Sequence, residues 1–215
     1  MAALRSLCIL VFAKAPVAGE VKTRLIPALG AAGAANLYRA MARHCISTAV
    51  TAFHGAVELW CSPDVHHVFF EESRTKWNLT SRPQGPGDIG ARMSAAMRSA
   101  LEGAEAVLLM GTDVPALTAA DIGAAAAALS GGCDAVFVPT ADGGYGLIGL
   151  RRHDPRLFDG IAWSTPAVMA QTRDRLRLLG WRWVELPPRW DVDDKADLDR
   201  LHADANLAYL LRETA

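Results

Sequence analysis

Neither sign of charge is in excess in this sequence, because 22 lysine and arginine residues nearly balance 23 acidic ones and leave a net charge of -1. Proteins that bind nucleic acid without sequence preference present a strongly positive surface, so the composition argues against that class. An anionic ligand would have to be held by a local cluster of cations. The 51% of hydrophobic and 21% of charged residues are typical of a globular protein.

Cysteine motifs and membrane-length apolar runs are also missing. The cysteines form no CxxC pair and lie mostly within apolar segments, at Cys8, Cys45, Cys61 and Cys133. This pattern favours reduced thiols over disulfides or a zinc site, and we expect a cytoplasmic protein. No uncharged run in the sequence, the alanine-rich residues 122–133 included, reaches the roughly 20 residues that span a bilayer. We expect neither a membrane nor a nucleic-acid partner.

Both common fingerprints of phosphate-binding loops, GxGxxG and GxxxxGK[ST], are missing after the first apolar run, residues 7–11. That run predicts a buried strand, and the stretch FAKAPVAGEVKTRL follows it at once. Backbone N–H groups and cationic side chains at the end of a strand can hold phosphate oxygens. We interpret the stretch as the phosphate-binding loop of another class of nucleotide site. The alternative is that its cationic side chains only make a connecting loop soluble and bind no ligand. The residues expected to bind nucleotide here are Lys14, Gly19, Lys22, Thr23 and Arg24.

Apolar runs and helical spacing alternate along the rest of the chain, with no composition break or repeat. Expected strands lie at 57–61, 77–82, 106–110, 135–139, 145–150 and 182–186, and expected helices at 31–53, after Asp88, at 118–129, at 165–179 and from near Lys195. Residues 63–74 are ambiguous, and we assign no role to His66 and His67. The alternation predicts one α/β domain over residues 1–215, with a mostly parallel central sheet, an antiparallel strand at 145–150 and helices on both faces.

Aspartates follow two of the expected strands. Asp113 lies just past the carboxyl end of the 106–110 strand, which is where ligands bind in open α/β sheets. Asp191 and Asp193 follow the last strand, and residues two apart in an extended chain project to the same side. If the three carboxylates meet, a cation is needed to relieve their repulsion. Mg²⁺ commonly takes one or two carboxylates with water and phosphate oxygens, so we expect Mg²⁺ or Mn²⁺ at these three aspartates.

Several polar positions have a structural alternative. Asp88 is as well suited to cap the following helix as to contact a ligand. Asp193 or Asp194 can likewise cap the last helix, and this alternative is strong for Asp194. Gly143 and Gly144 allow a ligand to approach closely, but they serve a plain hairpin equally well.

Taken in this order, the stretches FAKAPVAGEVKTRL, QGPGDIGARM, GTDVPAL, TADGGYGLIGL and WSTPAVMAQT resemble the DUF2064 family of proposed glycosyltransferases over nearly the whole chain. That family belongs to the nucleotide-diphospho-sugar transferase (GT-A) superfamily, and some members are associated with arsenosugar biosynthesis. The chain is more distantly similar to the 2-phospho-lactate guanylyltransferases, which share the KTRL loop, a GxDxP-type turn and a late DxD pair. Glycosyltransferases of the superfamily often carry DxD directly after the central strand, whereas this chain has GTD.

The resemblance implies a division of the site between a nucleotide donor and an acceptor. It implies phosphate binding by Lys14, Lys22 and Arg24, and metal binding by Asp113, Asp191 and Asp193. It implies that Gln84, Gly87 and Asp88 lie near the base or ribose, and that Asp142, Gly143 and Gly144 face the acceptor.

We expect a magnesium-dependent transferase that moves a glycosyl group from a nucleotide-diphospho-sugar to a small-molecule acceptor. Lys22 and Arg24, with a metal at Asp113, would stabilise the leaving diphosphate, and Asp142 would accept the proton of the acceptor hydroxyl. One alternative is a nucleotidyltransferase, in which an anionic acceptor attacks the α-phosphorus of a nucleoside triphosphate and pyrophosphate leaves. Another is a non-catalytic nucleotide-binding protein.

Overall fold

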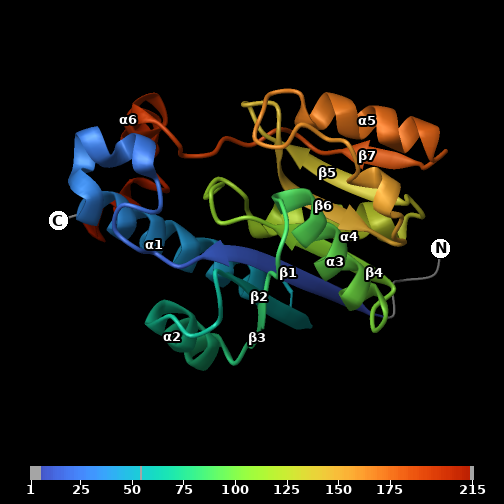
Figure 1. The fold of residues 1–215 in the computed structure, drawn as a ribbon, viewed down its shortest axis with the longest axis horizontal. Helices are drawn as coiled ribbons and strands as arrows, with labels where there is room; N and C mark the ends of the chain where they lie inside the picture. Colours follow the sequence, from blue (N-terminus) through green and yellow to red (C-terminus); the bar gives the residue numbers. More distant parts are fainter. Residues whose placement is uncertain (1–5, 54, 214–215) are drawn as a thin grey trace.

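Seven strands form one sheet in the computed structural model, which describes residues 6–53 and 55–213 (Figure 1). The strand order is β3-β2-β1-β4-β6-β5-β7, and β6 is antiparallel to both neighbours while the other adjacent pairs are parallel. The strands are β1 (Leu7–Lys14), β2 (Ala56–Ser62), β3 (Thr80–Pro83), β4 (Ala106–Met110), β5 (Ala135–Pro139), β6 (Tyr145–Leu150) and β7 (Trp183–Glu185). The expected α/β class and mostly parallel sheet are confirmed.

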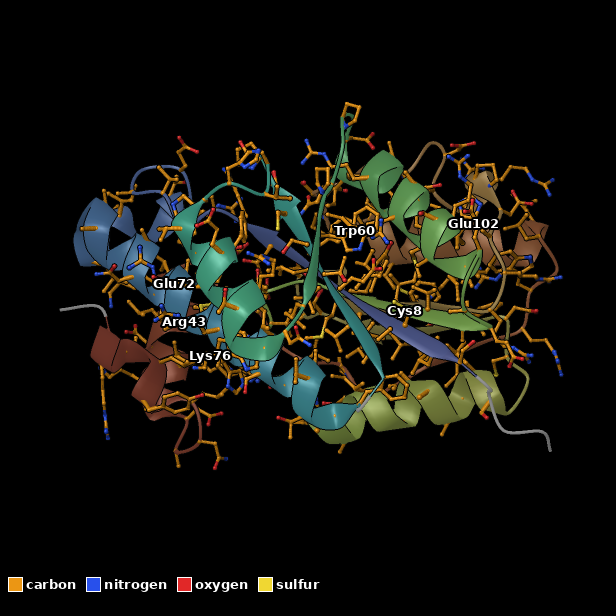
Figure 2. All side chains as sticks on the ribbon, turned by 90° about the horizontal axis from the view of Figure 1, so that it is seen from below. Cys8, Arg43, Trp60, Glu72, Lys76 and Glu102 are labelled. Atoms are coloured by element: carbon orange, nitrogen blue, oxygen red, sulfur yellow. The ribbon has the colours of Figure 1, made fainter. Side chains whose placement is uncertain are left out.

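Helices cover both faces of this sheet. The α-helices are α1 (Ile26–Ala52), α2 (Val68–Trp77), α3 (Ile89–Leu101), α4 (Ala119–Ser130), α5 (Val168–Leu178) and α6 (Lys195–Ala203), and the short 3-10 helices are η1 (Thr23–Leu25), η2 (Pro155–Leu157) and η3 (Ala208–Glu213). Helices α3 and α5 pack on one face, and α1, α2 and α4 pack on the other. Figure 2 shows α3 and α4 on opposite sides of the strands. In the same view, Arg43 of α1 and Glu72 of α2 are labelled; they form an ion pair of 3.0 Å.

Strand β1 shows why the sheet is covered on both faces. Ile9 and Val11 belong to the core with α1 and α4, whereas Leu10 and Phe12 belong to the core with α3 and α5. Successive side chains of a strand point to opposite faces, so an uninterrupted apolar run needs cover on both. A third cluster joins α1 to α6 and the segment before it, and Figure 1 shows these helices side by side although they are far apart in sequence.

Three expected boundaries are wrong. Helix α1 begins at Ile26 rather than at residue 31. Helix α2 begins at Val68 within the ambiguous segment and ends at Trp77, so β3 starts only at Thr80. Helix α5 begins at Val168 rather than at Thr165. The Thr165 hydroxyl instead closes a turn before the helix, where it donates to a carbonyl three residues earlier at 2.7 Å.

Three helices begin at capping residues that the sequence contains. The Asp88 side chain accepts a hydrogen bond from the first turn of α3 and therefore caps this helix, which is the structural alternative considered for it. Thr118 and Asp121 form the expected capping box of α4. At α6 the cap is Asp194, which forms a second capping box with Asp197. Within the described part of the chain, no helix is long and apolar enough to cross a membrane.

Candidate functional site

The candidate site lies where the carboxyl ends of β1, β2 and β4 meet the loop of residues 15–22. A main-chain hydrogen bond of 2.7 Å from Ala15 to the Ser62 carbonyl holds the start of this loop to the end of β2. Gly19 turns with φ 86°, a left-handed value that glycine adopts without steric cost. The loop then returns Lys22 to the edge of the sheet.

Lys22 is the centre of the site. Its side chain is 4% exposed, and its ammonium contacts Asp113 Oδ1 and lies 2.7 Å from Asp193 Oδ1. Burial by itself lowers the pKa of Lys22, but attraction to the two carboxylates outweighs burial and raises it, so the ammonium stays charged. Sequence reasoning expected Lys22 to bind phosphate opposite these aspartates, and the structure places it directly between them.

The two carboxylates that contact Lys22 come from segments that are far apart in the sequence. Asp113 lies just past the end of β4, after Gly111 and Thr112, and its carbonyl accepts a hydrogen bond of 3.0 Å from Val192 N. This bond fixes the segment 191–193 beside the end of β4. Next to it, Trp190 is 8% exposed and lies 4.6 Å under the guanidinium of Arg200 from α6, which anchors the same segment.

Tyr38 of α1 joins two strand ends at the base of the site. Its hydroxyl accepts a hydrogen bond of 2.8 Å from Lys14 N and lies 2.9 Å from the Thr112 hydroxyl. Tyr38 is 4% exposed, so these bonds are shielded from water. Sequence reasoning placed this residue only within the expected helix 31–53 and gave it no role in the site. The signal that could have distinguished it is that a buried tyrosine needs a partner for its hydroxyl.

A cavity of about 260 Å³ is lined by both the cationic and some of the acidic residues that the sequence analysis selected. It is lined by Lys14, Glu20, Val21, Lys22, Thr23, Arg24, Tyr38, Asp113 and Asp193. The Lys14 ammonium donates to the Glu20 carbonyl at 2.8 Å. Gly19 shapes the turn that leads into this first cavity.

A second cavity, of about 300 Å³, adjoins the first, because Lys14, Tyr38 and Asp113 line both. Gln84 lines the second cavity, and its amide nitrogen donates to main-chain carbonyls of β1 and β2 at 3.1 and 2.9 Å. Since both partners only accept hydrogen bonds, the nitrogen must face them, and the amide oxygen is left as an acceptor. Gln84 therefore joins two strand ends and still has one polar atom to offer a ligand.

Arg92 of α3 also lines the second cavity, and its Nε donates to the Gly87 carbonyl at 2.9 Å. Gly87 turns with φ 96°, and Asp88 caps α3, so these two residues set the start of the helix that carries Arg92. Sequence reasoning did not select Arg92, because one arginine in an amphipathic helix gives no signal of its own. The residues that line the second cavity do not include Gly87 and Asp88.

Asp142, Gly143 and Gly144 form the turn between β5 and β6, outside the lining of both cavities. Asp142 Oδ1 accepts hydrogen bonds from the Thr140 hydroxyl at 2.5 Å and from Gly144 N at 3.0 Å. A Cβ at Gly143 would lie 2.3 Å from the Pro166 carbonyl oxygen. The close approach that Gly143 permits is therefore to protein backbone, and its contact with an acceptor stays a prediction.

Asp191 belongs to an acidic group that extends from the first cavity toward this turn. Burial raises the pKa of Asp191 to about 6, and the negative charges of Asp142, Asp193 and Asp197 add to the rise. The β5–β6 turn thus lies close enough to the segment 191–193 for Asp142 to act on Asp191.

The carboxylate oxygens that contact Lys22 could hold a divalent cation. Asp113 and Asp193 each direct one oxygen to the same point, and their side chains are 54% and 44% exposed, which leaves them accessible to water and phosphate. Residues 6–53 and 55–213 contain no group of three or more histidine, cysteine, aspartate or glutamate side chains placed to hold a metal by themselves. Two carboxylates completed by substrate oxygens are the arrangement that these residues support.

Comparison with known proteins identifies close and distant relatives. The family described as "Uncharacterized protein conserved in bacteria (DUF2064)" matches residues 45–165. A crystal structure described as a "putative nucleotide-diphospho-sugar transferase" from Desulfovibrio desulfuricans G20 is 30% identical, with 97% of each chain covered and a TM-score of 0.83. None of the curated proteins compared with the chain matches it in sequence.

Other solved structures share the fold at low identity. The 4-diphosphocytidyl-2C-methyl-D-erythritol synthase from Anaerococcus prevotii is 11% identical, covering 92% of this chain and 97% of its own, with a TM-score of 0.57. The glucosyl-3-phosphoglycerate synthase from Mycobacterium tuberculosis, solved with Mn²⁺, UDP and glucosyl-3-phosphoglycerate, is 12% identical, covering 98% and 80%, with a TM-score of 0.52. The family, the fold and the transferase class expected from the sequence are confirmed: this chain belongs to the DUF2064 family and has the nucleotide-diphospho-sugar transferase fold.

Proposed function

We propose that this protein is a nucleotide-dependent transferase that binds its donor across the two adjoining cavities. The phosphates would lie in the first cavity, where Lys14, Lys22 and Arg24 supply positive charge, and the nucleoside in the second. The proposal rests on the shared lining by Lys14, Tyr38 and Asp113, which makes a charged compartment continuous with a partly apolar one. A nucleotide has the same two ends, and open α/β sheets bind ligands at this edge.

We further propose that Mg²⁺ or Mn²⁺ accompanies the donor, with Asp113 and Asp193 as its protein ligands; Asp191, which the sequence analysis expected as a third ligand, is not part of this convergent pair. The support is the pair of carboxylate oxygens that converge on one point at Lys22. A bound cation would neutralise the negative charge that grows on the leaving diphosphate. The Mycobacterium tuberculosis synthase, which has the same fold, was solved with Mn²⁺ and UDP.

Within this class we favour transfer of a glycosyl group from a nucleotide-diphospho-sugar. The acceptor hydroxyl would attack the anomeric carbon while the bond from that carbon to the diphosphate oxygen breaks, and the hydroxyl proton would pass to a carboxylate. Asp142 is the proposed base, because its turn orients it through two hydrogen bonds and its charge acts on Asp191. Lys22 and Arg24 would stabilise the departing diphosphate. The acceptor would then approach from the side of the β5–β6 turn.

The second candidate is nucleotidyl transfer with release of pyrophosphate. It is favoured by the two carboxylates that contact Lys22, which come from different segments. Asp113 follows β4 and Asp193 belongs to the segment 191–193, whereas a DxD motif would place both after β4. The resemblance to guanylyltransferases implies the same pair of acidic positions. A phosphate acceptor needs no base, so positioning and charge neutralisation by Lys22 and Arg24 would suffice.

Product analysis separates the two reactions. The protein is incubated with Mg²⁺ or Mn²⁺ and either nucleotide sugars or nucleoside triphosphates, with water or a panel of hydroxylated and phosphorylated small molecules as acceptor. Release of nucleoside diphosphate from a nucleotide sugar supports glycosyl transfer. Release of pyrophosphate from a triphosphate, with nucleotide sugars untouched, would replace it with nucleotidyl transfer.

The Asp113→Ala variant tests whether the protein is a catalyst. We expect turnover to fall roughly 100-fold or more, as when a group that stabilises developing charge is removed. Asp199→Ala is the matched control, because Asp199 is 63% exposed and pairs with Lys195 on the surface of α6. Nucleotide binding by the wild-type protein without turnover of any donor would instead favour a non-catalytic nucleotide-binding protein.

A further inference from the structure

We propose that Lys22 is an internal counter-ion that holds the position of the divalent cation, so that metal and nucleotide phosphate bind together and neither binds tightly alone. This inference rests on the proposed function, because it concerns the order in which that site is filled. It assigns Lys22 a role in coupling the two ligands in addition to binding phosphate.

The contacts of Lys22 are those of a cation between two acidic ligands. Its ammonium reaches one oxygen of Asp113 and one of Asp193, and its side chain is 4% exposed whereas the two carboxylates are 54% and 44% exposed. One enclosed positive atom therefore neutralises two open negative groups at the point where their oxygens converge. Convergent aspartate oxygens are the protein ligands that Mg²⁺ uses.

The neighbouring cations of the first cavity are placed differently. Lys14 directs its ammonium to a main-chain carbonyl, that of Glu20, at 2.8 Å. Arg24 lines the cavity and is exposed. Of these three cations, Lys22 is the one for which the described residues show carboxylate partners. Lys14 and Arg24 can thus meet a phosphate without breaking an ion pair, whereas Lys22 cannot.

A metal ion that enters between Asp113 and Asp193 would meet the ammonium of Lys22 and be repelled by it. Lys22 can leave only if another anion replaces its two carboxylates, because an unpaired buried ammonium is unstable. The phosphate of a nucleotide in the same cavity is such an anion. Metal and phosphate together therefore exchange one set of ion pairs for another, and each must strengthen the binding of the other by the same factor.

The backbone at Lys22 is consistent with a residue held in place by its partners. Lys22 has φ 47° and ψ 43°, a left-handed conformation at the start of η1 that costs energy for a residue with a side chain. Such conformations persist where the surroundings restrain them, and the two ion pairs provide that restraint.

The test compares thermal unfolding of the wild-type protein and Lys22→Met in EDTA, Mg²⁺ and Mn²⁺ without nucleotide. We expect the wild type to melt at the same temperature in all three. Lys22→Met leaves Asp113 and Asp193 facing each other, so it should melt lower in EDTA and recover with either metal. Lys14→Met is the matched control, since it removes the same charge from the same cavity and should show no metal-dependent recovery.

A Mn²⁺ titration followed by electron paramagnetic resonance gives a second readout. Its wild-type part, Mn²⁺ binding with and without nucleotide, can be measured even if Lys22→Met does not fold. Without nucleotide, Lys22→Met should bind Mn²⁺ roughly tenfold tighter than the wild type or more. Any of ADP, CDP, GDP or UDP that binds the wild type should strengthen its Mn²⁺ binding by a similar factor. Wild-type Mn²⁺ binding as tight as that of Lys22→Met, or unaffected by a nucleotide that binds, would overturn the proposal. If no nucleotide binds under any metal condition, the proposed function fails, while the comparison of Lys22→Met with the wild type in metal alone still decides the role of Lys22.

Discussion

Removal of the Tyr38 hydroxyl should loosen the base of the site by a measurable amount. In Tyr38→Phe, the Lys14 N–H loses its partner at 2.8 Å in a place where the ring is 4% exposed. Thr112 also loses a partner, but its hydroxyl lies 3.5 Å from the Phe12 carbonyl and can turn to it. The change therefore leaves one unsatisfied buried donor, which costs about 2 kcal/mol. For a chain of this size that corresponds to a fall in melting temperature of about 4–8 °C.

Urea unfolding of Tyr38→Phe measures this loss, which should lower the transition midpoint at an unchanged slope. Ser73→Ala is the control, because it removes a buried hydroxyl of α2 that only donates to the Phe69 carbonyl within the same helix. The control should be less destabilised and should bind nucleotide like the wild type, whereas Tyr38→Phe should bind it more weakly. If the free energy of unfolding of Tyr38→Phe lies within about 0.5 kcal/mol of the wild-type value, the hydroxyl does not join the strand ends and this reasoning is refuted.

Two further predictions concern Gly143 and Asp121. Gly143→Ala should lower the melting temperature, because φ is 92° and the added Cβ would lie 2.3 Å from the Pro166 carbonyl oxygen; Gly123→Ala, in open space on α4, should raise it slightly. Calorimetry of the two variants checks the signs, and equal effects would contradict them. The bonds from Arg189 and Thr118 outweigh burial and lower the pKa of Asp121, so its contribution to stability is present above the carboxyl's ordinary pKa and is lost as pH falls through the lowered value. Urea unfolding from pH 7 to pH 2 should show this loss in the wild type and less of it in Asp121→Asn; identical profiles would exclude Asp121 as its source.

Local patterns predicted most of the fold and the edge at which the site lies. Apolar runs marked the strands because a sheet covered on both faces has no polar positions to interrupt them. Capping residues marked the starts of α3, α4 and α6, because their side-chain contacts lie within one turn. The segment at 63–74 was ambiguous because the two neighbouring phenylalanines, Phe69 and Phe70, fit a helix and a strand equally well; both are buried in the core beneath α2.

The side-chain contacts within the site could not be predicted from the spacing of residues in the sequence. The bond from Lys22 to Asp193 joins residues 171 positions apart, and it depends on how β4 and the late segment are brought together. The role of Tyr38 depends on a partner 74 positions away. The sequence indicated that cations and carboxylates meet at one edge, but the direct contact between Lys22 and two aspartates required the folded backbone.

The hydrogen bond from Val192 to Asp113 makes completion of the site depend on synthesis of the chain through the segment 190–193. A nascent chain that has already emerged from the ribosome through β6 carries Lys22 and Asp113 but still lacks the second carboxylate. A chain terminated before Trp190 would contain the cationic loop and the central strands without that acidic half. Both partners of Lys22 are thus present only in chains synthesised through residues 190–193, so a prematurely released product cannot assemble the complete ion-pair set.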